Sequence, residues 1–401
     1  MSGNGTPYAT LDSDAIRRTL EKYGTINVNR GLAKDRYFRV KENILSGYVQ
    51  ANFEAGRFRG NVGGRYVFTR DRSQFYVQSG GIFAPTTVTT DDNRFLPAAN
   101  LIFQAGENVV LRGSAAKVIA RPRYSDLAGS LSLDDTTRSG SGGNPGLKPY
   151  AATNFGLSAE WYFAPQSIFS VALFKKDVKS FPVSATLTGQ TFTSTGLPAS
   201  VLSASSPAFL NPAQQAQPIW TVVTTVNGTG ASLKGVEIAI QAPFRFLPGF
   251  LKNFGGIANA TFIDSTATYS QSAPATAVNA NGSLTLPNRP FQSTLYGVSK
   301  KAFNATLYYE DKKFSARASV SYRGPYVDAG SGTGNVFEGY NAITNVDASV
   351  RYKLTDWIEL SVEGTNLTDA YRDRYTDTAA NRNYEYNHFG RTILFGARLK
   401  L

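Results

Sequence analysis

The fold class is decided by the stretch LYYEDKKFSARASVSYRGPYVDAGSGTGNVFEGYNAITNVDASVRYKLTDWIELSVEGTNL, residues Leu307–Leu367. Three runs in it alternate apolar and polar side chains at every second residue: FSARASVSYR (Phe314–Arg323), VDASVRYKL (Val346–Leu354) and IELSVEGT (Ile358–Thr365). A side-chain period of two is typical of β-strands with one apolar and one polar face. The polar face points outward in a soluble sandwich and inward in a membrane barrel, and aromatic residues near the strand ends fit the barrel.

Length and composition favour one continuous β architecture. The chain has 401 residues, 12% aromatic residues and 37 glycines, and no shift of composition divides it into domains. No apolar run approaches the ~20 residues of a membrane helix, whereas a spanning strand needs only ~9–11 residues, half of which can be polar. The absence of cysteine excludes a disulfide framework and thiolate metal sites.

The formal net charge of +12 raises the question of a nucleic-acid partner. The basic residues are spread along the chain without a Lys/Arg block or a recognisable nucleic-acid motif, so we expect no such partner. A charged barrel lumen and surface cations facing anionic lipid head groups account for the same excess.

Alternating runs recur through the chain and predict thirteen strands in an antiparallel order. They are Leu45–Glu54, Phe58–Arg72, Phe95–Ala105, Val109–Arg121, Ala152–Phe163, Ile168–Phe181, Ala231–Gln241, Phe254–Ser265, Thr294–Glu310, Phe314–Arg323, Val346–Leu354, Ile358–Asp369 and Tyr386–Leu401.

The connections between these strands are alternately short and long. The short ones are Glu54–Arg57, Gly106–Asn108, Ala164–Ser167, Asp311–Lys313 and Thr355–Trp357, with Ala242–Asn253 as a longer exception. The long ones, expected to be structureless, are Ser73–Arg94, Tyr124–Tyr150, Pro182–Pro218, Thr266–Asn288, Gly324–Ile343 and Ala370–Glu385. Compact soluble domains rarely contain so many long loops, whereas outer-membrane barrels combine short periplasmic turns with long extracellular loops.

The barrel interpretation assigns roles to two sets of side chains. The aromatic residues near the short turns would form a girdle at the periplasmic interface: Phe53, Phe58, Trp161, Tyr162, Phe163, Tyr308, Tyr309 and Trp357. The arginines on the polar face would line the lumen as candidate ligand contacts: Arg59, Arg65, Arg112, Arg317 and Arg351.

The N-terminal segment Met1–Lys41 is predicted to be mostly loop, with one short helix at Asp12–Lys22. It has no cationic n-region, apolar core or cleavage site, so it is not a secretory signal.

Other features that resemble sites favour structural interpretations, and we expect no enzyme, cofactor or metal centre. The glycine-rich run Gly140–Pro145 fails the dinucleotide pattern at Pro145 and precedes no helix. His388 is the only histidine, so a histidine metal site or a His-based nucleophile pair cannot form within the chain. The remaining acidic features are Asp91-Asp92-Asn93 and Asp134-Asp135, which suit solvated turns better than calcium loops, and Glu359 with Glu363, which are too far apart along a strand for a glycosidase pair.

Several stretches resemble the TonB-dependent receptors of the Gram-negative outer membrane, particularly the Xanthomonas–Caulobacter type. They are ENILSGYVQANFEA (Glu42–Ala55), LRGSAAKVIARPRYSDL (Leu111–Leu127), GNPGLKPYAATNFGLSAEWYFAP (Gly143–Pro165), FSVALFKKDVKSF (Phe169–Phe181), LKGVEIAIQAPFRFLPGFLKNFG (Leu233–Gly255) and VEGTNLTDAYR (Val362–Arg372). The terminal GRTILFGARLKL is similar to the family's assembly signal, although Leu401 stands where an aromatic residue is usual.

The resemblance implies an all-β, antiparallel transmembrane barrel of roughly 22 strands, of which this chain holds about thirteen C-terminal ones. Residues 1–41 would be the remnant of an extracellular loop and residues 42–401 a partial barrel. The family's signal peptide, coupling box and plug domain are not found, which suggests truncation, gene fragmentation or a misplaced start.

The resemblance also implies a function in the cell outer membrane. The expected role is TonB-energised uptake of a scarce nutrient, more an oligosaccharide than a siderophore, and the alternative is a passive porin-like channel or a surface adhesin. The implied partners are outer-membrane lipid and lipopolysaccharide, a small-molecule or oligosaccharide ligand, and the TonB complex through the missing N-terminal part.

Overall fold

The computed structural model describes residues 22, 34, 37–79, 82–193, 199, 202, 204–205, 207–272, 277–278, 284–285, 288–328, 338–376 and 380–400. The predicted helix Asp12–Lys22 and most of the predicted loop Met1–Lys41 lie outside these residues. The first wall strand begins at Phe38, seven residues before the predicted start, so the end of the predicted loop is strand. No helix among the described residues is both long and apolar enough to span a membrane.

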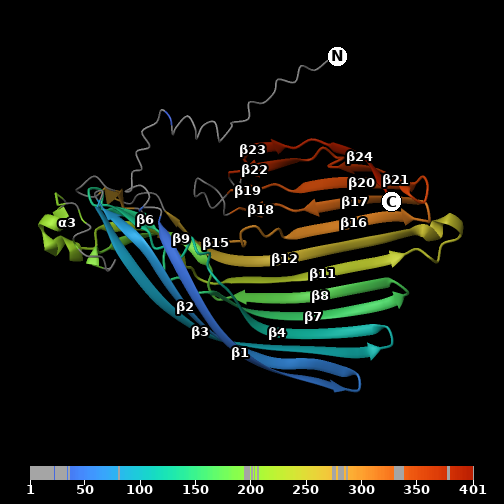
Figure 1. The fold of residues 1–401 in the computed structure, drawn as a ribbon, viewed down its shortest axis with the longest axis horizontal. Helices are drawn as coiled ribbons and strands as arrows, with labels where there is room; N and C mark the ends of the chain where they lie inside the picture. The colour runs from blue at the N-terminus through green and yellow to red at the C-terminus, as the bar shows by residue number, and fades with distance from the viewer. Residues whose placement is uncertain are drawn as a thin grey trace, which may run out of the picture.

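One curved antiparallel wall dominates the structure (Figure 1). Its thirteen strands are β1 (Phe38–Ala55), β2 (Phe58–Ser79), β3 (Ile82–Gly106), β4 (Val109–Ala120), β7 (Tyr150–Ala164), β8 (Ser167–Val178), β11 (Ala231–Pro243), β12 (Phe254–Ser272), β16 (Lys301–Glu310), β17 (Phe314–Arg323), β20 (Ile343–Lys353), β21 (Ile358–Thr365) and β24 (Thr392–Leu399). Each strand pairs antiparallel with the next in this order. The predicted all-β, antiparallel partial barrel is therefore confirmed.

The wall does not close on itself within the described residues. There β1 forms its ladder with β2 alone, and β24 forms its ladder with β21 alone. The wall therefore has one free edge at each end of the chain.

Strand register separates the side chains into an apolar and a polar face. Val320 of β17 lies opposite Ala305 and Val346 of the neighbouring strands, whereas the adjacent Ser319 lies opposite Thr306 and Asp347. Directly paired residues point to the same side of a sheet, so this alternation extends from strand to strand. The apolar face includes many exposed large side chains, among them Leu45, Leu157, Leu173, Leu307 and Phe395.

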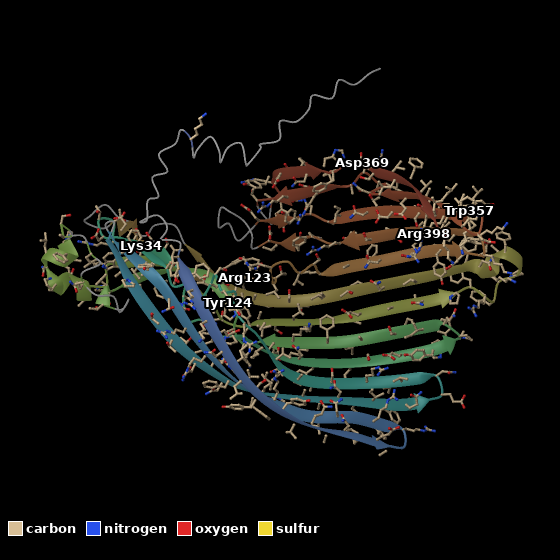
Figure 2. All side chains as sticks on the ribbon, in the orientation of Figure 1. Lys34, Arg123, Tyr124, Trp357, Asp369 and Arg398 are labelled. Carbon is tan, nitrogen blue, oxygen red and sulfur yellow. The ribbon has the colours of Figure 1, made fainter. Side chains whose placement is uncertain are left out.

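Short turns join the strands at one end of the wall, called the turn end. Gly56 adopts a φ of 57° in the β1–β2 turn, a conformation that glycine adopts without steric cost. The 3-10 helix η4 (Gly249–Asn253) occupies the longer β11–β12 connection. Figure 2 places Trp357 at this end and Lys34 at the opposite end.

The predicted aromatic residues do gather at the turn end, but on both faces. Phe53 and Trp161 lie on the apolar face, in register with Gly60 and Val109. Tyr162 and Tyr308 point to the polar face, because Tyr162 donates a hydrogen bond to Glu160 and Tyr308 is in register with Arg317. The prediction that these two tyrosines belong to an outward girdle was wrong, since neighbouring strand residues alternate sides.

The opposite end, called the loop end, is far more ordered than predicted. The predicted loop Ser73–Arg94 is a hairpin in which β2 and β3 stay paired up to Ser79 and Ile82. Its Ser, Thr and Asp residues resemble loop composition, yet the β2–β3 ladder continues through them and pairs their backbone N–H and C=O groups. The remaining loop-end elements are β5 (Leu131–Asp134), β6 (Ser139–Gly142), β9 (Pro182–Gln190), α3 (Pro207–Leu210), η3 (Pro212–Ala216), β10 (Trp220–Asn227), β13 (Ala277–Val278), β14 (Leu284–Thr285), β15 (Asn288–Ser293), β18 (Tyr326–Val327), β19 (Gly339–Tyr340), β22 (Tyr371–Tyr375) and β23 (Asn383–His388).

A small apolar core holds part of the loop end together. β5 pairs in parallel with the end of β2, and β6 pairs in parallel with β10. Residues from these strands and from the segments between them form a buried cluster of Phe75, Val77, Leu133, Phe192, Leu202, Ala208 and Trp220. This core packs the loop-end segments against the ends of β2 and β3. We call β5, β6, β9, α3, η3 and β10 together the cap.

The predicted last strand Tyr386–Leu401 is two strands. β23 ends at His388 and belongs to a four-stranded loop-end sheet with β18, β19 and β22, whereas β24 belongs to the wall. Gly390, with a φ of 72°, lies in the break. The apolar and aromatic residues on both sides of the break obscured it in the sequence.

Candidate ligand-binding surface

All five candidate arginines lie on the polar face of the wall. Arg59 and Arg65 belong to β2, and Arg59 and Arg112 both lie in register with Ile102 of β3. Arg317 of β17 and Arg351 of β20 lie opposite Ser349 and Ser315, respectively. Each is in register with residues of the polar face, as the alternation in the sequence predicted, and the role of these arginines as ligand contacts stays a prediction.

Arg112 is held by a carboxylate on the next strand. Its Nε and Nη2 donate hydrogen bonds of 2.8 and 2.9 Å to the two carboxylate oxygens of Glu160 on β7. Tyr162 donates to the same carboxylate at 2.8 Å. A two-point bond of this kind fixes the orientation of the guanidinium group. Arg112 therefore forms a rigid ion pair with 38% of its side chain exposed.

Arg317 and Arg351 meet at a hollow of about 180 Å3 on the polar face. Tyr308, Glu310 and Ser349 contribute to its lining. Arg351 also forms a 3.0 Å ion pair with Glu363 of β21. The hollow therefore combines two guanidinium groups with hydroxyl and carboxylate groups.

Arg59 and Arg65 are more isolated on β2. Arg65 donates a 2.6 Å hydrogen bond to Ser46 Oγ of β1. Within the described residues, Arg59 forms no ion pair, although Glu54 lies opposite it in register. The structure thus distributes the five arginines along the wall and does not gather them into one site.

Two rows of neutral polar side chains on the polar face were not predicted. In the first row Asn100 donates to Asn61 at 3.0 Å, and in the second Asn304 donates to Asn259 at 3.0 Å. The second row continues to Ser321 and Asn345, because Ser321 is in register with Asn304 on one side and with Asn345 on the other. These residues lie beside a hollow of about 460 Å3. That hollow is lined by Asn304, Ser321, Asn345 and Arg323, among others. The rows join residues that are 39 and 45 positions apart in the chain, a relation that local periodicity does not reveal.

The four-stranded loop-end sheet carries a cluster of arginines and tyrosines that sequence reasoning also missed. The guanidinium carbon of Arg323 lies 3.7 Å from the ring centre of Tyr326, and that of Arg372 lies 3.8 Å from the ring centre of Tyr340. The two rings are 5.3 Å apart, and Arg372 donates a 2.8 Å hydrogen bond to Tyr326 Oη. Arg323 also donates to Ser299 Oγ at 3.1 Å and to Gly297 O at 2.6 Å, so the stacked guanidinium groups hold the loop end together and leave only their remaining N–H groups for an acceptor.

Arg374 anchors the same sheet from inside. Its guanidinium group lies 3.1 Å from Glu338, 3.6 Å from Glu385 and 3.7 Å from Asp328. Glu338 is only 2% exposed. Burial of a carboxylate is costly unless it is paired, so this ion cluster holds β19, β22 and β23 together.

The GNPGLKP motif (Gly143–Pro149), which begins one of the stretches that resemble the family, fastens one loop to another. Asn144 Nδ2 donates to Thr225 O at 3.0 Å, and Asn144 Oδ1 accepts from Gly146 N at 2.8 Å. Lys148 and Asn227 exchange two further bonds of 2.9 and 3.0 Å between backbone and side chain. The motif therefore clamps the entry to β7 against the end of β10.

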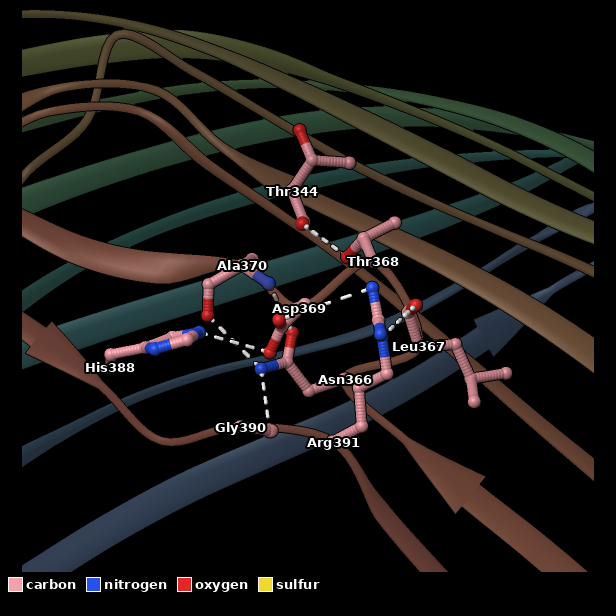
Figure 3. Close-up of polar contacts among 9 residues, drawn as sticks. All are labelled: Thr344, Asn366, Leu367, Thr368, Asp369, Ala370, His388, Gly390 and Arg391. Carbon is pink, nitrogen blue, oxygen red and sulfur yellow. Dashed lines mark hydrogen bonds and ion pairs between the residues drawn. The ribbon is translucent and has the colours of Figure 1, made fainter.

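A second motif, Asn366–Asp369, shapes the exit from β21 (Figure 3). Asn366 donates to Ala370 O and Gly390 O at 3.0 and 2.9 Å and accepts from Ala370 N at 2.8 Å. His388 Nε2 lies 3.0 Å from Asp369 Oδ1. The only histidine of the chain thus ends β23 and contacts the turn that leaves the wall after β21.

The aspartates considered as turn residues have mixed placements. Asp134 accepts from the N–H groups of Thr136 and Thr137, which is a turn as predicted. Asp135 is buried, and Asp91 lies within β3, where it forms a 2.7 Å ion pair with Arg70. The prediction of solvated turn residues holds only in part, since Asp135 lies in the same turn but is buried, whereas Asp91 is exposed but belongs to a paired strand. Among the described residues, no group of three or more metal-ligating side chains is found.

Comparison with known proteins decides the family. A family model described as TonB dependent receptor-like, beta-barrel matches residues 2–367. The chain belongs to this family of TonB-dependent receptors. Family members are transport receptors of the Gram-negative outer membrane and not enzymes. The resemblance noted in the sequence is confirmed.

Solved TonB-dependent receptors share this fold. The siderophore receptor PiuA from Acinetobacter baumannii superposes with a TM-score of 0.59 at 16% identity, over 90% of this chain and 44% of that chain. The ferric-catecholate import receptor Fiu from Escherichia coli K12 gives 0.57 at 16% identity, over 90% and 45%. The ferric yersiniabactin uptake receptor FyuA from Yersinia pestis gives 0.55 at 15% identity, over 90% and 46%.

The chain thus spans about half the length of these receptors. At such identities the likeness concerns the fold alone. A comparison with curated protein sequences finds no significant match.

Proposed function

We propose that the protein forms part of the wall of an outer-membrane receptor that takes up a scarce nutrient with energy supplied through the TonB complex. The observation that carries this proposal is the antiparallel wall with one apolar face, one polar face, short turns at one end and a folded cap at the other. The apolar face suits contact with lipid, and the polar face suits the interior path that a ligand would follow. Family members couple to TonB through an N-terminal part, and the same route is proposed here.

An oligosaccharide is our first candidate ligand. Amide groups both donate and accept hydrogen bonds, which suits sugar hydroxyls, and the rows Asn61–Asn100 and Asn259–Asn304 present such groups on the polar face. The hollow beside Asn345 and Arg323 adds apolar lining to these polar groups.

A ferric siderophore is the second candidate. The net charge of +12 and the guanidinium groups at the Arg317–Arg351 hollow suit an anionic chelate. The solved relatives PiuA, Fiu and FyuA are described as siderophore or iron-chelate receptors, which supports this candidate at the level of the family.

Uptake by cells that produce the whole receptor, of which this chain would form part of the wall, tests the proposal against a strain lacking the gene. Labelled oligosaccharides and radioactive ferric siderophores are supplied with and without an uncoupler of the proton gradient. We expect accumulation of one ligand class that needs both the gene and the gradient. Uptake that needs the gene but is unchanged by the uncoupler would support a passive porin-like channel. Attachment of the ligand to the cell surface without uptake would support an adhesin.

A further inference from the structure

The apolar face changes chemistry along its height. At the turn end its outermost positions are aromatic or aliphatic, such as Phe53, Phe103, Trp161, Phe254 and Phe314. At the loop end, six strands carry basic residues on this same face. These residues are Arg39, Lys41, Arg70, Arg72, Lys117, Lys175, Lys234 and Lys301.

Only part of this positive charge is neutralised within the wall. Arg70 pairs with Asp91 at 2.7 Å, Lys175 with Asp177 at 3.0 Å and Lys234 with Asp264 at 3.4 Å. Among the described residues, the other five basic side chains form no ion pair. The loop end of the apolar face therefore carries a strong positive excess.

The charge is densest on β1 and β2. Lys41 lies directly opposite Arg72. Arg39 lies two residues before Lys41 on the same side of β1, and Arg70 lies two residues before Arg72 on the same side of β2. We call Arg39, Lys41, Arg70 and Arg72 the basic block, and all four side chains are exposed. Like charges directly opposite each other destabilise a strand pair. The Lys41–Arg72 pair therefore favours an anion placed over it.

The basic block lies at the height of lipid head groups. A tilted strand needs ~9–11 residues to cross the hydrocarbon layer. Counted from Phe53 at the turn end, that distance along β1 reaches Asn43. Leu45, with 74% exposure, is the last large apolar side chain on the apolar face of β1. Lys41 and Arg39 follow immediately, at the level where phosphate groups of an outer leaflet lie.

We propose that the basic block binds the phosphate groups of the outer-leaflet glycolipid, lipopolysaccharide. The inference rests on the proposed outer-membrane location. Guanidinium groups bind phosphate with two parallel hydrogen bonds, and an ammonium group adds a point charge. A phosphate over Lys41 and Arg72 removes their mutual repulsion, so binding also stabilises the edge hairpin β1–β2.

The test measures bis-phosphorylated lipid A binding to the full chain purified from outer membranes in detergent. Lys41→Gln with Arg72→Gln is expected to weaken binding about 30-fold, since each basic residue near an anionic surface contributes roughly a factor of five. Lys312→Gln with Lys313→Gln makes the same charge change in the turn-end loop and is expected to leave affinity unchanged. Lipid A without phosphates is expected to bind no better than a neutral glycolipid.

A second variant separates lipid binding from folding. Arg72→Glu should abolish lipid A binding while raising the thermal stability of the lipid-free protein, because it turns a like-charge pair with Lys41 into an attractive one. Equal affinity of the Gln double variant and wild type would overturn the proposal, as would full competition by millimolar inorganic phosphate, which would indicate a free-phosphate site. Absence of the protein from outer membranes would refute the proposed function instead.

Discussion

Adjacent residues on one strand face different surroundings in the proposed membrane setting. Val320 lies on the apolar face, and Ser319 shares a 2.9 Å hydrogen bond with Thr306 on the polar face. We expect Val320→Arg to hinder barrel assembly at a cost of ~2–4 kcal/mol if the site is near the bilayer midplane. Ser319→Arg should be tolerated. Folded and unfolded forms can be compared by heat-modified gel mobility, and equal damage from both changes would indicate a sheet buried on two sides.

Asn144 provides a test of the loop clamp. Asn144→Ala removes the bonds to Thr225 and Gly146, each worth about 1 kcal/mol, and should lower the stability of the cap by ~2 kcal/mol. Hydrogen exchange should rise at the end of β10 while the wall strands stay protected. Asn387→Ala, which removes one bond to Glu385, is the matched control. Unchanged exchange at β10 would show that the motif does not clamp these loops.

Asp311 makes one turn sensitive to acid. Backbone N–H groups of Phe314 and Lys313, together with the Tyr309 hydroxyl, hold its pKa below the usual 3.8. A carboxyl whose pKa is depressed on folding stabilises the turn above the unfolded pKa and loses this contribution as the pH falls through the folded pKa. We expect the stability difference between wild type and Asp311→Asn to be constant near neutral pH and to shrink below about pH 4. A difference that grows on acidification would contradict this assignment.

At the scale of elements, the wall and the cap differ in accessibility. The predicted loop Pro182–Pro218 contains β9, α3 and η3, and within it Phe209 and Leu210 are 41% and 70% exposed. Chymotrypsin added to intact cells should therefore cut at Phe209 or Leu210. The segment has no Lys or Arg, so trypsin should not cut it.

Trypsin provides the opposite measurement. Lys312 and Lys313 lie in the exposed β16–β17 turn and should be cut only after the outer membrane is opened. Fragment masses from intact and lysed cells report both events. Cleavage at these lysines in intact cells would invert the proposed orientation.

At the scale of the whole molecule, the number of strands limits closure. Each wall strand runs antiparallel to its neighbour, so the first and the thirteenth, β1 and β24, run in the same direction. Joining the two edges would need a parallel ladder, which antiparallel membrane barrels do not contain. Unpaired backbone groups in lipid cost several kcal/mol each.

We therefore expect this chain, expressed alone with a secretion signal, to give no gradient-driven uptake. Labelled oligosaccharide would be measured with and without a proton gradient, beside an empty vector. A disulfide screen between cysteines placed in Phe38–Ala55 and Thr392–Leu399 should find no edge-to-edge contact. Gradient-dependent accumulation above the control would refute this expectation.

Strand positions and faces were predictable because each depends on neighbours in the sequence. Period-two alternation located the wall strands, placed Val320 and Arg317 on opposite faces and identified short turns such as Asp311–Lys313. The structure of the loop end was not predictable in this way. Asn144 and Thr225 are hydrogen-bonded although they are 81 positions apart in the sequence, and so are Lys148 and Asn227, which are 79 positions apart. Such contacts depend on how wall strands bring distant loops together, and residue order within a loop carries no signal for them.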